Sequence, residues 1–146
     1  MRVVIIGCGD PLKGDEALAW EAARELCALW PITSLLVRFC ERLTPDLADP
    51  IAKADLVIFL GTAADEPVGR VTGELVAAAA GGTEPARLLA QVSDRFGSRP
   101  EAWSFRVGAE RFGAGEELSA GARGALPDLL RQVSDLVTSR AAVHSA

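Results

Sequence analysis

The first sixteen residues join three unlike segments whose order restricts the possible folds. Val3–Ile6 is a continuous β-branched run, which is typical of a strand buried on both faces. Residues 7–14 follow with three glycines and one proline, the composition of a loop with unusual backbone angles. Asp15 and Glu16 then open a helix, where acidic side chains interact favourably with exposed N–H groups. This order predicts the first β–α turn of an open α/β sheet, where functional sites are often found.

Apolar runs and turn residues alternate along the rest of the chain. Thr44 with Pro45 is typical of a helix N-terminus, and a helix is expected from there to about Lys53. Pro31 and Gly97 are expected to close two further helices. Strands are expected near residues 3–7, 35–39, 56–60, 71–76 and 103–107.

Apolar stripes at helical spacing predict which helix faces are buried. The stripes are Leu18, Ala22, Leu26 and Leu29, then Leu88, Leu89, Val92 and Phe96, and last Leu126, Leu129, Leu130, Val133, Leu136 and Val137. Pro127 marks a start or a kink in the last helix. The pattern predicts one α/β domain over residues 1–137, with a largely parallel sheet and Glu16 at its carboxyl edge. Residues 138–146 are expected to form a disordered tail.

Composition excludes several classes of protein. The chain has 146 residues, of which 49% are hydrophobic and 24% charged, as expected for one globular domain. A net charge of −5 argues against a general binder of nucleic acid or of anionic membranes. No apolar run approaches the length of a membrane span, and the chain enters its first strand without a signal peptide. Three cysteines without paired metal-site spacing fit a reducing cytoplasm, where we expect the protein to be soluble.

Five segments, taken in order, carry a resemblance to a known family. They are Gly7–Glu16, Leu43–Ala48, Ala54–Phe59, Pro85–Leu89 and Phe112–Ser119. On these segments the chain resembles the hydrogenase maturation endopeptidases, which trim the C-terminal extension from the large subunit of nickel–iron hydrogenases. The resemblance implies a three-layer α/β/α fold, with a twisted five-stranded sheet mixed by one antiparallel strand. It also implies a large-subunit precursor as partner, the precursor's nickel as the recognition element, and no tightly bound cofactor.

The resemblance implies three nickel ligands, a Glu or Asp, an Asp and a His. Glu16 stands at the first of these positions. Gly61 stands at the second and Gly81-Gly82 at the third, and glycine has no side chain to coordinate a metal. The only histidine, His144, lies in the expected tail. We therefore expect weak nickel binding, and recognition of the precursor retained better than its cleavage.

Other side chains could replace the missing ligands. Asp65 and Glu66 follow Gly61, and Cys8 and Cys40 end two expected strands, with cysteine a soft donor suited to nickel. Each also has an ordinary explanation, as an exposed loop acid or a small buried residue. The candidate substrate-binding residues are Asp10, Thr44 and Asp65.

Two other functions fit parts of the pattern. A non-catalytic protein could hold the precursor during hydrogenase assembly without cutting it. A nucleotide-binding domain is suggested by Gly7-Cys8-Gly9, although the third position of the dinucleotide fingerprint is Leu12. Glu41 could then mimic the acid that binds the ribose, although it lies farther along the chain than usual.

Overall fold

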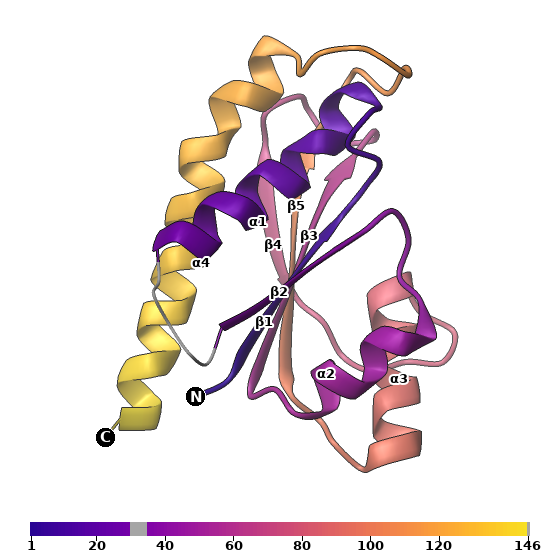
Figure 1. Ribbon diagram of the computed structural model, residues 1–146, viewed down its shortest axis with the longest axis vertical. Coiled ribbons are helices and arrows are strands. Elements are labelled where there is room, and N and C mark those ends of the chain that lie inside the picture. The colour runs from indigo at the N-terminus through magenta and orange to yellow at the C-terminus, as the bar shows by residue number, and fades with distance from the viewer. Residues whose placement is uncertain (30–34, 146) are drawn as a thin grey trace.

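The computed structural model describes residues 1–29 and 35–145. Five strands form one sheet in the order β2-β1-β3-β5-β4 (Figure 1). Neighbours among β1, β2, β3 and β5 are parallel, whereas β4 runs antiparallel to β5. The bounds are β1 Val3–Cys8, β2 Leu35–Cys40, β3 Leu56–Ala63, β4 Val71–Leu75 and β5 Glu101–Gly108. The mixed, mostly parallel five-stranded sheet expected from the sequence is confirmed.

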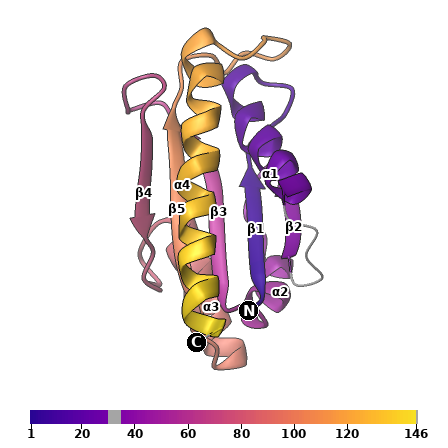
Figure 2. The ribbon, with the colours of Figure 1, turned by 90° about the vertical axis from the view of Figure 1, so that its left-hand side faces the viewer.

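Helices cover both faces of this sheet, which gives three layers. The α-helices are α1 Ala17–Leu29, α2 Ala48–Ala52, α3 Glu84–Phe96 and α4 Ala120–Ser145, with 3-10 turns η1 Gly14–Glu16 and η2 Pro45–Leu47. Figure 2 shows α4 and α1 on one face, with α2 and α3 behind the sheet. No helix within residues 1–29 and 35–145 is long and apolar enough to cross a membrane.

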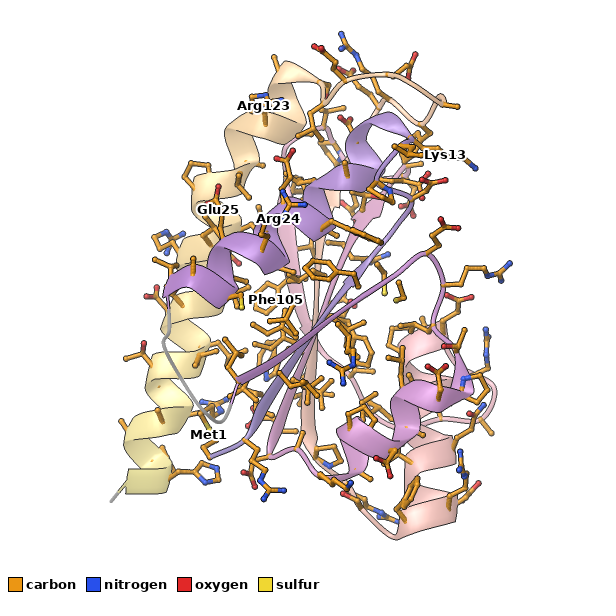
Figure 3. The ribbon with its side chains drawn as sticks, in the orientation of Figure 1. Met1, Lys13, Arg24, Glu25, Phe105 and Arg123 are labelled. Atoms are coloured by element: carbon orange, nitrogen blue, oxygen red, sulfur yellow. The ribbon has the colours of Figure 1, made fainter. Side chains whose placement is uncertain are left out.

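The β-branched run of β1 supplies both hydrophobic cores. Val3 and Ile5 pack in the core under α1 and α4, whereas Val4 and Ile6 pack in the core under α2 and α3. Both isoleucines are fully buried, and burying a side chain of this size contributes about 1.5–3 kcal/mol. Phe105 of β5 belongs to the first core and lies between the sheet and the helices in Figure 3. The central strands are therefore fixed from both sides.

Local capping residues form both ends of α3, and the end at Gly97 is the one that the sequence predicted. The Thr83 hydroxyl accepts a hydrogen bond from the Ala86 N–H at 3.4 Å, at the start of α3. Gly97 ends α3 with a left-handed φ of 67°, and its N–H donates to the Ser93 carbonyl at 2.9 Å. Thr44 precedes η2 as expected, but its hydroxyl donates to the Asp46 carboxylate.

The last helix differs most from the expectation. Pro127 lies inside α4, which begins at Ala120. The segment expected as a disordered tail is helical up to Ser145. The Arg140 Nε–H donates to both carboxylate oxygens of Glu101, at 2.8 and 2.9 Å, which ties the end of α4 to β5. This contact joins positions 39 residues apart, so the local sequence did not reveal it.

Two residues of the expected stripes are exposed. Leu29 is 56% exposed and Phe96 is 43% exposed, because each is the last residue of its helix. Pro31, expected to close α1, lies outside the described residues.

Candidate functional site

The loops that could form a site meet at one edge of the sheet. β1, β2, β3 and β5 all end at this edge, because they are parallel neighbours. Figure 1 shows the β1–α1 and β5–α4 connections together there, with both chain termini at the opposite end. Lys13, on the first of these loops, points into solvent in Figure 3. Glu16 therefore lies at the carboxyl edge, as predicted.

Asp15 joins the two connections. Its side chain is completely buried. The carboxylate accepts hydrogen bonds from the N–H groups of Glu110, Arg111 and Ser119 at 2.9, 3.1 and 2.7 Å, and from the Ser119 hydroxyl at 2.9 Å. The Asp15 N–H in turn donates to the Arg111 carbonyl at 2.7 Å. We call these four residues the Asp15 anchor.

The anchor also explains why residue 14 is a glycine and why the Asp15 carboxyl group is ionised. Gly14 has a left-handed φ of 57°, and a Cβ there would lie 2.5 Å from the Arg111 carbonyl oxygen. Burial opposes ionisation of Asp15, but the hydrogen bonds from Glu110, Ser119 and Arg111 outweigh it and lower the pKa of this carboxyl group. Asp15 is therefore an ionised structural residue, whereas the sequence indicated only an acid at a helix start.

Glu16, the next residue, has a very different environment. It is partly exposed, and its carboxylate accepts one hydrogen bond, from the Asp10 N–H at 3.3 Å. The loop approaches it closely, because a Cβ on Gly9 would lie 2.6 Å from the Glu16 carbonyl oxygen. Gly9 has a φ of 142°, which also favours glycine. The loop thus presents Glu16 with coordination capacity to spare.

The two other expected ligand positions are open. An ideal Cβ built on Gly61 or on Gly81 meets no heavy atom within 4 Å. A Cβ on Gly82 would lie 3.0 Å from the Ala86 Cβ, so that position is tight. Neither Gly61 nor Gly81 is among the glycines with positive φ. Packing and backbone geometry therefore do not require glycine at these two positions.

Gly61 belongs to a row of residues that crosses the sheet. Cys8 is paired with Cys40, and Gly61 is paired with Arg106. The pairing of Gly7 with Leu60 places Cys8 level with Gly61, since both are the next residues along parallel strands. Both cysteines pack toward α2 and α3, and strand alternation directs position 61 and Arg106 to that same face. We call Cys40, Cys8, Gly61 and Arg106 the edge row.

The two cysteines of the edge row are in contact. Their Sγ atoms lie 3.3 Å apart, within hydrogen-bond distance for sulfur. This hydrogen bond lowers the pKa of Cys40, and together with burial it raises the pKa of Cys8. A single thiolate shared by both sulfurs is the ionised state that this geometry favours.

The remaining candidates are dispersed. Asp10 caps its own loop by accepting from the Leu12 N–H at 2.9 Å, and Thr44 is exposed beside a shallow groove against α3. Asp65 is exposed in the turn after β3. Glu66, in the same turn, lies 4.0 Å from Arg70. Within residues 1–29 and 35–145, no three His, Cys, Asp or Glu side chains converge to hold a metal ion.

The structure places His144 at the edge opposite Glu16, and contacts within the chain explain the glycines of the first loop. His144 is exposed in the last turn of α4, near the start of β5 and thus at the opposite edge from Glu16. Gly7 allows α1 to approach β1, because a Cβ there would lie 2.9 Å from the Ala19 carbonyl oxygen. Contacts within the chain thus account for Gly7 and Gly9 without a bound nucleotide. The acidic side chains of Asp15 and Glu16 would also repel the pyrophosphate of a dinucleotide at this loop.

Comparison with known proteins identifies the fold. No protein-family model matches the chain, and no curated protein is significantly similar to it. The solved structure of the nickel–iron hydrogenase maturation protease HycI from Thermococcus kodakarensis KOD1 matches with 20% identity and a TM-score of 0.75, over 94% of this chain and 92% of that one. The hydrogenase maturating endopeptidase HybD from E. coli matches with 17% identity and a TM-score of 0.79, over 95% and 94%.

A third structure supports the same assignment. The hydrogenase 2 maturation peptidase from Thaumarchaeota archaeon SCGC_AB-539-E09 matches with 18% identity and a TM-score of 0.71, over 94% of this chain and 99% of that one. These matches span nearly the whole of each chain. The protein therefore has the fold of the hydrogenase maturation proteases.

Proposed function

We propose that this protein is a relative of the hydrogenase maturation proteases that binds the large-subunit precursor of a nickel–iron hydrogenase without cutting it. The observation that carries the proposal is the contrast among the three expected ligand positions. Glu16 is present and has spare coordination capacity, whereas Gly61 and Gly81 leave the two other ligand positions open. One carboxylate is a weak anchor for a divalent ion in water.

The charge of the edge row supports weak metal binding. Arg106 is paired with Gly61 and faces the same side of the sheet. It lines a groove of about 460 Å³ together with Glu84 and Thr83 of the α3 N-terminus. A guanidinium beside position 61 repels a divalent cation that would bind there. Arg106 therefore disfavours a metal ion at position 61.

Retention of the surrounding scaffold supports recognition of the precursor. The Asp15 anchor fixes residues 110, 111 and 119 against η1, so that the β5–α4 connection stays beside Glu16. The Leu43–Ala48 segment borders a groove against α3. A rigid edge with a free carboxylate is a surface on which a protein chain can dock. We place this binding in the cytoplasm, where three cysteines are ordinary.

The experiment is a binding measurement with three forms of a hydrogenase large subunit. Immobilised protein is exposed to nickel-loaded precursor, nickel-free precursor and mature subunit without its C-terminal extension. We expect binding to the precursor, and weaker binding to the mature subunit. Glu16→Gln should weaken binding of the nickel-loaded form, whereas Glu25→Gln, an exposed residue of α1, should not. Absence of binding to every form would contradict the proposal.

A further inference from the structure

Cys8 and Cys40 form a pair that the proposed function does not use. They end neighbouring parallel strands, in register, and their sulfurs lie 3.3 Å apart although 32 positions separate them in the chain. Adjacent strands lie about 4.8 Å apart, which is within the Cα–Cα range of about 4.4–6.8 Å found in disulfides. The backbone therefore already has the spacing that a bond between these sulfurs requires.

The pair is also accessible from the carboxyl edge. Both cysteines are partly exposed, and the neighbouring position 61 carries no side chain that could cover Cys8. The charged groups close enough to influence the thiols are acidic, Glu84 for both and Asp46 for Cys40. A small reagent can reach sulfur here without displacing a core residue. Cys27, the third cysteine, is exposed elsewhere on α1.

We propose that Cys8 and Cys40 form a reversible disulfide by exchange with a low-molecular-weight disulfide. Two sulfurs already in contact need to approach by about 1.2 Å to reach the bond length of about 2.05 Å. A disulfide needs only these two sulfurs, whereas a divalent metal ion needs at least a third donor. Within the described residues, no third donor converges on the pair. The geometry thus favours the disulfide over a metal site.

The exchange proceeds in two steps. The Cys40 thiolate attacks one sulfur of the reagent, whose S–S bond breaks to release one thiolate that takes up a proton. The Cys8 thiol then loses its proton and attacks the Cys40 sulfur of the mixed disulfide, which releases the second reagent thiol. Two electrons pass from the two cysteines to the reagent, and two hydrogen atoms leave the protein with the released thiols.

The bond would link the two connections that begin at the ends of β1 and β2. Gly9 already donates from its N–H to the Cys40 carbonyl at 3.0 Å, so the chains following the two strands start in contact. A covalent link closes a long loop and reduces the freedom of the unfolded chain. Oxidised protein should therefore melt at a higher temperature than reduced protein. This inference is independent of precursor binding.

The test uses the full chain with Cys27→Ser, which leaves only the pair. Reduced protein is incubated with excess oxidised glutathione, then analysed by intact mass, by thiol counting in denaturant and by peptide mapping. We expect loss of two hydrogen atoms, no glutathione adduct, no free thiol, a peptide linking positions 8 and 40, and full reversal by dithiothreitol. The melting temperature should rise on oxidation and return on reduction.

Two control variants isolate the pair. Cys8→Ser with Cys27→Ser, and Cys27→Ser with Cys40→Ser, each retain one thiol and should give only a glutathione adduct or a free thiol, without the rise in melting temperature. Stable glutathione adducts on the Cys27→Ser protein would overturn the proposal. Survival of both free thiols, or their protection by one tightly bound zinc ion per chain, would overturn it as well.

Discussion

Two adjacent acidic residues, Asp15 and Glu16, lie at the same sheet edge in opposite environments. Asp15 is completely buried and accepts four hydrogen bonds, whereas Glu16 is partly exposed and accepts one, at 3.3 Å. The first belongs to a fully satisfied network, and the second is free to meet a ligand. The comparison teaches that the Asp15 anchor supports the edge, whereas the open positions Gly61 and Gly81 carry no comparable structural demand.

The anchor should be the most sensitive point of the edge. Asp15→Asn replaces one acceptor oxygen by an NH2 group that faces N–H donors, so buried donors lose their partner. We expect a loss of about 2–4 kcal/mol in the free energy of unfolding. Urea denaturation of the wild type, Asp15→Asn and Glu16→Gln measures it. A loss as small for Asp15→Asn as for Glu16→Gln would remove the distinction between the two residues.

The same substitution at two glycines sharpens the comparison. Gly14→Ala places a Cβ at a left-handed φ and 2.5 Å from the Arg111 carbonyl oxygen, so we expect a loss of about 1–3 kcal/mol. Gly61→Ala meets no atom within 4 Å and should change stability by at most about 0.5 kcal/mol. Thermal or urea unfolding compares the two variants. Equal losses would show that position 61 is also under structural constraint.

A feature could be predicted from the sequence where the interacting residues lie close together in the chain, and not where they lie far apart. The strands are local apolar runs, so all five could be predicted, and the helix ends at Thr83 and Gly97 follow from local capping. The partners of Asp15 lie about a hundred residues away, and no local pattern connects them. Cys8 and Cys40 could be placed at strand ends, but register between parallel strands is set by packing.

Adding ligands at Gly61 and Gly81 tests whether nickel binding is weak only because coordinating side chains are missing. Gly61→Asp with Gly81→His adds a carboxylate and an imidazole at positions where a Cβ meets nothing within 4 Å. We expect nickel to bind about tenfold more tightly than to the wild type, because a carboxylate and an imidazole are donors that the wild type lacks at these positions. Calorimetric titration at neutral pH measures it, with Gly61→Asn and Gly81→Gln as the shape-matched control. Tight stoichiometric binding by the wild type would contradict the account.

The charge of Asp15 predicts a smaller effect that depends on pH. Its pKa is lowered in the folded protein, so its ionisation stabilises the fold above the unfolded value of about 3.9. That contribution is lost as pH falls through the lower, folded pKa. The difference in unfolding free energy between the wild type and Asp15→Asn should therefore shrink below about pH 3.9. Urea titrations across this range measure it, and a difference that stayed constant or grew would be inconsistent with an ionised anchor.

The measurement that tests the central claim most directly is cleavage of the precursor. Purified wild-type protein is incubated with a nickel-loaded large-subunit precursor that it binds, and the subunit is then weighed by mass spectrometry. The account predicts a stable complex whose C-terminal extension remains intact, because Glu16 is the only one of three expected ligands with a coordinating side chain. Release of the extension by the wild type, abolished by Glu16→Ala, would contradict it and show a working enzyme with an altered site.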